Sequence, residues 1–439
     1  MNKKILDLAI PNIISNISIP LLGIVDMALM GHMESDAYIG AIALGSLIFN
    51  FIYWSLGFLR MGTSGFTAQA LGRRDLPETI LVFSRAAFIA IIMSLLLLLL
   101  QGPIENLSFL VLKGETRVED LAMTYFRIRV WAAPAALGQF ALLGFFLGMQ
   151  NARLPMVVLV LTNVINIICN YLFVIKLGMG SDGVALGTVI AQYSGLLTAI
   201  FFFRKYFRKL FKYWSLQATI QWDKLKHFLL INSNIFIRTM CLVIVFSIFT
   251  ARSASVDMQN AGDDTILAVN SILMQFFMFF SFLIDGFAHA SEALTGKFIG
   301  ARDRSSLIRS IRLLFIWGTG ISILFTLIYL LGGNAIFRAL TNNTEVIANA
   351  KPYFFWVVMI PMLSYTAFLW DGIFIGATAG PEMRNAMLIS TLLIFFPAYI
   401  LAGRLMGNHG LWLAFILFMV ARGITMQLMA RKAVYSKVP

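Results

Sequence analysis

The stretch "LAIPNIISNISIPLLGIVDMALMGHM" at residues 8–33 decides the fold class, because it is apolar and long enough to cross a bilayer. A transmembrane helix needs roughly 20 predominantly apolar residues in a row. The stretch also holds one carboxylate, Asp26. An ionisable group inside a span is costly and indicates function by default. The stretch therefore predicts a membrane protein in which Asp26 couples transport to an ion.

The composition of the whole chain agrees with this prediction. The 439 residues are 59% hydrophobic and 13% charged, with a mean hydropathy of +0.83. A soluble protein has roughly 45–50% apolar and 25% charged residues. The apolar runs are much longer than the strands of a transmembrane barrel, so we expect an all-α polytopic membrane protein.

About twelve runs reach the length of a membrane-spanning helix. They cover residues 7–30, 38–70, 79–101, 121–148, 156–177, 184–203, 226–250, 264–297, 307–332, 350–377, 385–404 and 410–429.

The net charge of +13 is better explained by membrane orientation than by nucleic-acid binding, because the basic residues lie in short links between spans. If the spans alternate, the basic links fall on one side, and the positive-inside rule puts both termini in the cytoplasm of a bacterial-type inner membrane. The first apolar run has no small-residue cleavage site, so it is read as a span and not as a signal peptide. The basic links contain Lys3 and Lys4, Arg73 and Arg74, Arg153, residues 204–212, Lys297 to Arg312, Arg384, and Arg431 to Lys437.

Two motifs recur in the same order and indicate an internal duplication. Residues 57–75 resemble 281–303, and residues 131–148 resemble 356–376, where both copies share a Trp, a Pro and two glycines four apart. Six spans return the chain to its starting side, so the halves form a parallel repeat, a common transporter plan. The predicted parts are an amino lobe at 1–203, a basic linker at 204–225 and a carboxy lobe at 226–439.

A polar cluster is expected in the outer leaflet of the amino lobe. Asn166 and Asn170 are four apart and share a helix face. Thr188 and Asp26 lie at a similar depth when counted from the outer ends of their spans at about 1.5 Å per residue. Oxygen ligands of this kind suit a hard cation or a proton. The alternative is that the amides and the hydroxyl only bond helix to helix.

The span that holds Asp26 also contains Pro11 and Pro20, which each remove a helical hydrogen bond. The segment can bend near Asp26, either as a static kink or as a hinge.

Four further charges fall inside predicted spans: Arg60, Arg238, Asp285 and Asp371. For Arg60 and Asp285, a structural ion pair or a latch between lobes competes with direct substrate contact. Asp371 lies beside Trp370 and glycines, and is a candidate second acid for a cationic ligand. All four are therefore candidate substrate or gating residues.

Metal and cofactor chemistry is not expected. His289 and Glu292 are three apart on a helix, but no further His or Cys ligand lies near them in sequence. Cys169 and Cys241 are predicted to be small buried hydrophobes. No nucleotide-binding glycine loop is evident, so energy must come from an ion gradient or from the substrate's own gradient.

The motifs together resemble those of the multidrug and toxic compound extrusion (MATE) family, specifically its DinF branch. The matching segments are 11–33, 57–75, 129–156, 162–188, 230–254 and 282–303, with the weaker "WDGIFIGATAGPEMRNAM" at 370–387.

The resemblance implies twelve helices in two six-helix lobes that export cationic or amphipathic organic compounds in exchange for protons or sodium ions. It implies that Asp26 is the coupling acid, that Asn166, Asn170 and Thr188 complete its polar cluster, and that Pro11 bends the first helix. Family members commonly carry an aspartate where this chain has Asn170. That departure leaves Asp26 as the one acid expected in the cluster and favours protons over sodium.

Two other functions compete with drug–proton antiport by a non-enzymatic carrier. A flippase for lipid-linked precursors shares the two-lobed plan, but needs several basic residues in its cleft, where Arg60 and Arg238 are the obvious ones. An intramembrane enzyme acting on lipid needs clustered acids or histidines, and the sequence offers none. A two-lobed chain in the bilayer can complete its pathway as a monomer.

Overall fold

A computed structural model describes residues 1–30, 36–112, 115–259 and 265–438. Within these residues the chain forms helices and no strand. Twelve helical segments are long and apolar enough to cross a membrane, which confirms the predicted all-α, twelve-span fold class.

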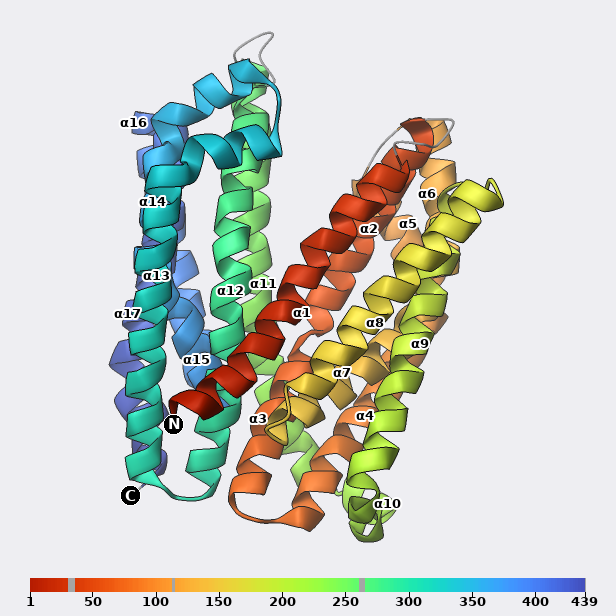
Figure 1. Cartoon of the computed structure of the whole chain (residues 1–439), viewed down its shortest axis with the longest axis vertical. Helices are drawn as coiled ribbons and strands as arrows, with labels where there is room; N and C mark the ends of the chain where they lie inside the picture. The colour runs from red at the N-terminus through yellow and green to blue at the C-terminus, as the bar shows by residue number, and fades with distance from the viewer. Residues whose placement is uncertain (31–35, 113–114, 260–264, 439) are drawn as a thin grey trace. The chain divides into compact units, whose positions relative to one another are not determined.

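The first half of the chain supplies six of these segments, several of them built from two consecutive helices (Figure 1). Its helices are α1 (Asn2–Met30), α2 (Asp36–Leu56), α3 (Phe58–Gly72), α4 (Leu76–Leu99), α5 (Gln101–Val111), α6 (Thr116–Arg129), η1 (Val130–Ala132), α7 (Ala133–Gly148), α8 (Arg153–Asn170), η2 (Tyr171–Lys176), α9 (Ser181–Phe207), η3 (Arg208–Tyr213) and α10 (Leu216–Thr219).

The second half supplies the other six segments. Its helices are α11 (Trp222–Gln259), α12 (Thr265–Gly300), α13 (Arg304–Leu340), α14 (Thr344–Gly376), α15 (Gly380–Leu388), η4 (Ile389–Phe395), α16 (Phe396–Met406), α17 (Asn408–Ala433) and η5 (Tyr435–Lys437).

The chain forms two compact units. The amino unit is Ile14–Asn232, and the carboxy unit is Met1–Ile13 with Ser233–Pro439. The unit boundaries therefore lie inside α1 and α11, whereas the predicted lobes, 1–203 and 226–439, were divided at a linker. The assignment of those lobes stays a prediction.

A glycine explains why the first residues of α1 pack with the carboxy unit. A Cβ atom on Gly286 of α12 would lie 2.4 Å from Cγ1 of Ile13 and 2.9 Å from the carbonyl oxygen of Ala9. Because glycine has no side chain, the backbone of α12 at Gly286 can lie directly against Ala9 and Ile13 of α1. Trp317 of α13 adds a hydrogen bond, donated from Nε1 to Oδ1 of Asn2 at 3.4 Å.

The predicted basic linker is largely helical and belongs to the amino unit. Its first residues continue α9, and Leu210 in η3 is buried in a hydrophobic cluster that includes Phe203. Further along, Ser215 caps α10, and Arg85 of α4 donates to the carbonyl oxygen of Ala218 at 3.4 Å. The linker is therefore packed against α4 and α9.

The predicted duplication appears as the same close helix contact in each unit. In the amino unit, a Cβ atom on Gly144 of α7 would lie 2.4 Å from the carbonyl oxygen of Arg60 in α3. In the carboxy unit, a Cβ atom on Gly372 of α14 would lie 2.0 Å from the carbonyl oxygen of Ala288 in α12. Small residues spaced in this way let membrane helices approach closely. The glycines that the sequence analysis paired thus have the same packing role.

The turn that follows the second span is also repeated. Arg74 and Arg302 have positive φ values of 58° and 55°, which is uncommon for residues other than glycine. The next residue, Asp75 or Asp303, caps the following helix by accepting a backbone N–H bond at 3.0 Å. The bond from the Ser306 N–H lowers the pKa of Asp303, which keeps the cap charged.

Gly372→Ala is expected to destabilise the carboxy unit. Overpacking of a filled contact costs about 1–3 kcal/mol. Gly320→Ala in α13 is the matched control, because a Cβ atom there meets nothing within 4 Å. Thermal unfolding of the purified variants, followed by tryptophan fluorescence, should show a lower Tm for Gly372→Ala alone. Equal Tm values for the two variants would contradict the close-contact role.

Candidate functional site

The amide and hydroxyl residues predicted for the amino-lobe cluster form one hydrogen-bonded chain between α8 and α9. Asn170 donates from Nδ2 to Oδ1 of Asn166 at 3.2 Å, and Asn166 donates from Nδ2 to Oγ1 of Thr188 at 3.2 Å. Both asparagines are buried and Thr188 is half-buried. A Cβ atom on Gly187 would lie 2.3 Å from Oδ1 of Asn170, so this glycine admits the amide between the helices.

The backbone changes where this chain of hydrogen bonds ends. Residues Tyr171–Lys176 continue α8 as a π-helical stretch, directly after Asn170. Such stretches are rare and occur often at functional sites. The polar cluster therefore coincides with an irregular segment of its span.

Asp26 lies in α1, but its side chain is outside the part of the chain that the structure describes. A neighbouring contact fixes the level of α1 against α8: Asn163 donates from Nδ2 to Oγ of Ser18 at 2.8 Å. The two helices run in the same direction within the amino unit (Figure 1). Asp26 follows Ser18, and Asn170 follows Asn163, by about two helical turns each.

Pro11 and Pro20 both lie inside α1, which is helical from Asn2 to Met30. Pro11 is buried and Pro20 is half-buried. Their part in bending the helix stays a prediction.

A charged cluster is buried in the carboxy unit and joins α11, α14 and α17. Arg238 donates to Oδ2 of Asp371 at 2.8 Å, and Arg422 donates to the same oxygen at 2.5 Å. Only 6%, 12% and 3% of the side chains of Arg238, Asp371 and Arg422 are exposed. One carboxylate thus holds two guanidinium groups out of solvent.

Two further interactions help to balance the second guanidinium. Asp285 of α12 interacts electrostatically with Arg422, and Ser281 donates to Oδ2 of Asp285 at 3.5 Å. The Arg422 guanidinium also lies 5.5 Å from the ring centre of Phe418, within cation–π distance. The cluster therefore holds two arginines in direct contact with Asp371, and Asp285 adds a weaker electrostatic interaction with Arg422.

The structure brings together Arg238, Asp285 and Asp371, which the sequence singled out separately. Sequence reasoning missed Arg422, although it is a charge inside the predicted span 410–429 and meets the criterion that selected Arg238. Arg60 lies in α3 of the amino unit and is half-buried, and Asp285 belongs to the carboxy unit. Their proposed pairing stays a prediction.

Glu292 of α12, which the sequence offers only as a candidate metal ligand, is a buried acid. Glu292 is 1% exposed, and Nδ1 of His289 lies 3.5 Å from its Oε2. Neither carboxylate oxygen has a hydrogen-bond partner among the described residues. The same residues contain no group of three or more His, Cys, Asp or Glu side chains that could hold a metal. Burying a charged carboxylate in this way is costly, so Glu292 joins the candidate functional residues.

Two helical units and twelve candidate spans define a polytopic membrane protein. The MatE family model matches residues 11–172 and again 235–400. The chain therefore belongs to the MatE family of multidrug and toxin extrusion transporters, which are not enzymes.

Relatives by sequence support the family and its DinF branch. The chain is 36% identical over 431 residues to the DNA damage-inducible protein F of Escherichia coli (strain K12), covering 98% of this chain and 92% of that protein. It is 28% identical over 224 residues to the Multidrug and toxin extrusion protein 1 of Oryctolagus cuniculus, covering 50% of this chain and 39% of that protein.

Solved structures share the fold at low identity. A MOP superfamily transporter from Pyrococcus furiosus Vc1 (DSM3638) matches with a TM-score of 0.87 and 18% identity, covering 99% of this chain and 96% of that chain. A MATE structure in the bent conformation matches with a TM-score of 0.86 and 18% identity over the same shares.

Asp371→Ala is expected to destabilise the carboxy unit by about 3–5 kcal/mol, because two buried guanidinium groups lose their shared partner. Arg422→Met should cost less, since Asp371 keeps its bond to Arg238. Thermal unfolding of both variants in detergent distinguishes these outcomes. A smaller loss for Asp371→Ala than for Arg422→Met would refute this account of the cluster.

Proposed function

We propose that this transporter exports cationic or amphipathic organic compounds in exchange for protons, with Asp26 as the coupling carboxylate. The observation that carries the proposal is the bond between Ser18 and Asn163, which supports a common level for Asp26 and Asn170 along parallel helices. A carboxylate at the level of buried amide and hydroxyl oxygens is the combination of ligands that suits a small cation.

The charge of the cluster favours a proton over sodium. Oδ1 of Asn166 already accepts from Asn170, and Oγ1 of Thr188 accepts from Asn166, so each of these oxygens keeps one lone pair for a cation. Asn170 carries no charge. Asp26 is then the group that changes charge during the cycle, and a proton is enough to neutralise it.

Protonation drives release of the substrate in this mechanism. In the outward-facing state a proton neutralises Asp26 and weakens the hold of the polar cluster on substrate or on hydrating water. Bending of α1 near Pro11 and Pro20 accompanies release. The proton and the substrate need only bind the two conformations with different affinities.

Asp26→Asn is expected to abolish efflux driven by a proton gradient. The assay measures export of a fluorescent organic cation from proteoliposomes with an imposed pH gradient. Asp182→Asn, which removes an acid from the first turn of α9, is the matched control and should retain activity. Full activity of Asp26→Asn would exclude the mechanism.

Asn170→Asp should make transport depend on sodium. The change supplies the second acid that the family commonly carries, and two adjacent carboxylates bind a cation more strongly than one. Transport measured with pH and sodium varied independently should show sodium stimulation in the variant and little in the parent chain. Strong sodium stimulation of the parent chain would instead identify sodium as the coupling ion.

The proposal includes an inner-membrane location, cytoplasmic termini and a functional monomer. The basic residues of the linker and of the segment from Arg431 to Lys437 support this orientation.

Export of a lipid-linked anion is the second candidate function, and Arg422 favours it by adding a buried guanidinium to Arg238. The relative from Pyrococcus furiosus is described as having a binding pocket of reverse polarity that suggests a different function. Against this candidate, Asp371 and Asp285 offset both arginines. Movement of a lipid-linked sugar, without efflux of the organic cation, would select this function.

A further inference from the structure

A groove lies on the amino unit between α4, α7 and α9, and is closed at one end by η3. It has a volume of about 780 Å³. Most of its lining is apolar, and two arginines supply its charge. Phe83, Ala87, Ile91, Gly138 and Leu196 are typical of the apolar wall, and Arg204 and Arg208 are the charged members.

Small residues keep the groove open. A Cβ atom on Gly138 of α7 would lie 3.0 Å from Cδ1 of Leu196, so a side chain there would crowd the opposite wall. Ala87 and Ala90 of α4 also present little volume. The wall runs from Phe83 to Ser94 on α4, a rise of about 16 Å at 1.5 Å per residue. That length accommodates a large part of one acyl chain.

Aromatic rings pack together near the charged end of the apolar wall. The ring of Phe83 lies 4.6 Å from that of Phe203, and the ring of Phe203 lies 5.4 Å from that of Phe211 in η3. At the surface of the amino unit, the groove residues Ile91 and Ile200 are 58% and 38% exposed. In a membrane-spanning unit, exposed apolar side chains of this kind contact lipid.

The charged end suits an anion at the membrane–water interface. Arg204 and Arg208 are exposed and form no ion pair with a described residue. They belong to the run 204–212, which contains five cations and no acid. Basic pockets between membrane helices bind anionic lipid head groups.

The neighbouring lysines of the same run differ from the arginines in their surroundings. Lys205 lies over the ring of Tyr206 at 5.4 Å, and Lys209 is not part of the groove lining. The position of the charges, and not their number alone, therefore distinguishes the groove.

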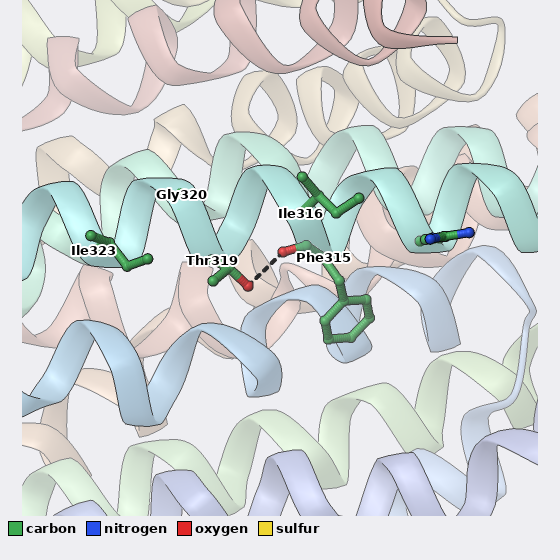
Figure 2. A pocket seen from close by; sticks show the side chains of 6 residues that line it. Phe315, Ile316, Thr319, Gly320 and Ile323 are labelled. Atoms are coloured by element: carbon green, nitrogen blue, oxygen red, sulfur yellow. Dashed lines mark hydrogen bonds between the residues drawn. The ribbon is translucent and has the colours of Figure 1, made fainter.

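A hollow in the carboxy unit provides a contrast. Its lining comes from α13 alone, from Arg312 to Ile323, and its hydroxyl group, Thr319, donates within the helix to the carbonyl oxygen of Phe315 at 2.9 Å (Figure 2). Thr319 also lies 3.1 Å from the hydroxyl oxygen of Tyr365 in α14, but all the residues that line the hollow belong to α13, so the lining supplies one wall for an acyl chain and not two.

We propose that the groove of the amino unit binds one anionic phospholipid, with an acyl chain along α4 and α7 and the phosphate between Arg204 and Arg208. A cationic substrate is disfavoured by the arginines, and a free phosphate ion would leave the apolar wall unfilled. The lipid thus contacts α4, α9 and the packed linker together.

Native mass spectrometry of the full chain with phosphatidylglycerol or phosphatidylcholine tests the proposal. The variant Arg204→Gln with Arg208→Gln should bind phosphatidylglycerol about tenfold more weakly, because each cation near the surface contributes to anionic lipid binding. The pair Lys205→Gln with Lys209→Gln makes the same charge change and should reduce binding much less. Equal losses would overturn the proposal in favour of a diffuse basic surface.

A second variant tests the acyl chain. Ala87→Leu fills the groove and should weaken binding of phosphatidylglycerol, whereas Gly320→Leu in the hollow of the carboxy unit should not. Unchanged thermal unfolding checks that both variants are folded. Inorganic phosphate at millimolar concentration should not displace the lipid. Full displacement by phosphate would show a free-anion site, and unchanged lipid binding by the folded Ala87→Leu variant would show that the acyl chain lies elsewhere. Either result would refute the proposal.

Discussion

The bilayer offers no water to charged or polar groups, and this constraint governs the rest of the structure. A group of this kind in a span is stable when it finds a partner inside the protein. Asp371 meets the requirement with two arginines, and Asn166 meets it with an amide and a hydroxyl. The two solutions differ in charge: the carboxy cluster balances its ions internally, while the described part of the amino cluster is neutral.

The sequence predicted the features that the bilayer imposes directly. Span number follows from hydropathy, because each span must cover the same thickness of hydrocarbon. The bond between Asn166 and Asn170 follows from helical periodicity, since residues four apart share a face. The glycines Gly144 and Gly372 also stood out in the sequence as a repeated pattern. The structure explains the repeat, because at both positions a Cβ atom would overlap the backbone of the neighbouring helix.

Features that depend on long-range packing could not be predicted. The pairing of Asp371 with Arg422 requires α14 and α17 to face each other in one register, which neither span encodes alone. The packing of residues 1–13 with the carboxy unit depends on the gap at Gly286, a residue far away in sequence. The hydropathy pattern also predicts the basic segment 204–225 to be a simple linker. In the structure, Leu210 of this segment is buried in a hydrophobic cluster of the amino unit.

The glycine contacts have a mechanical consequence. Where α14 meets α12 at Gly372, and α7 meets α3 at Gly144, backbone lies against backbone or side-chain stem, with no flexible layer between them. Helices joined in this way cannot slide without losing many contacts at once, because close-packed interiors resist gradual deformation. Each of these two helix pairs therefore moves as one rigid unit. Conformational change during transport must therefore take place in segments that lack such a glycine contact.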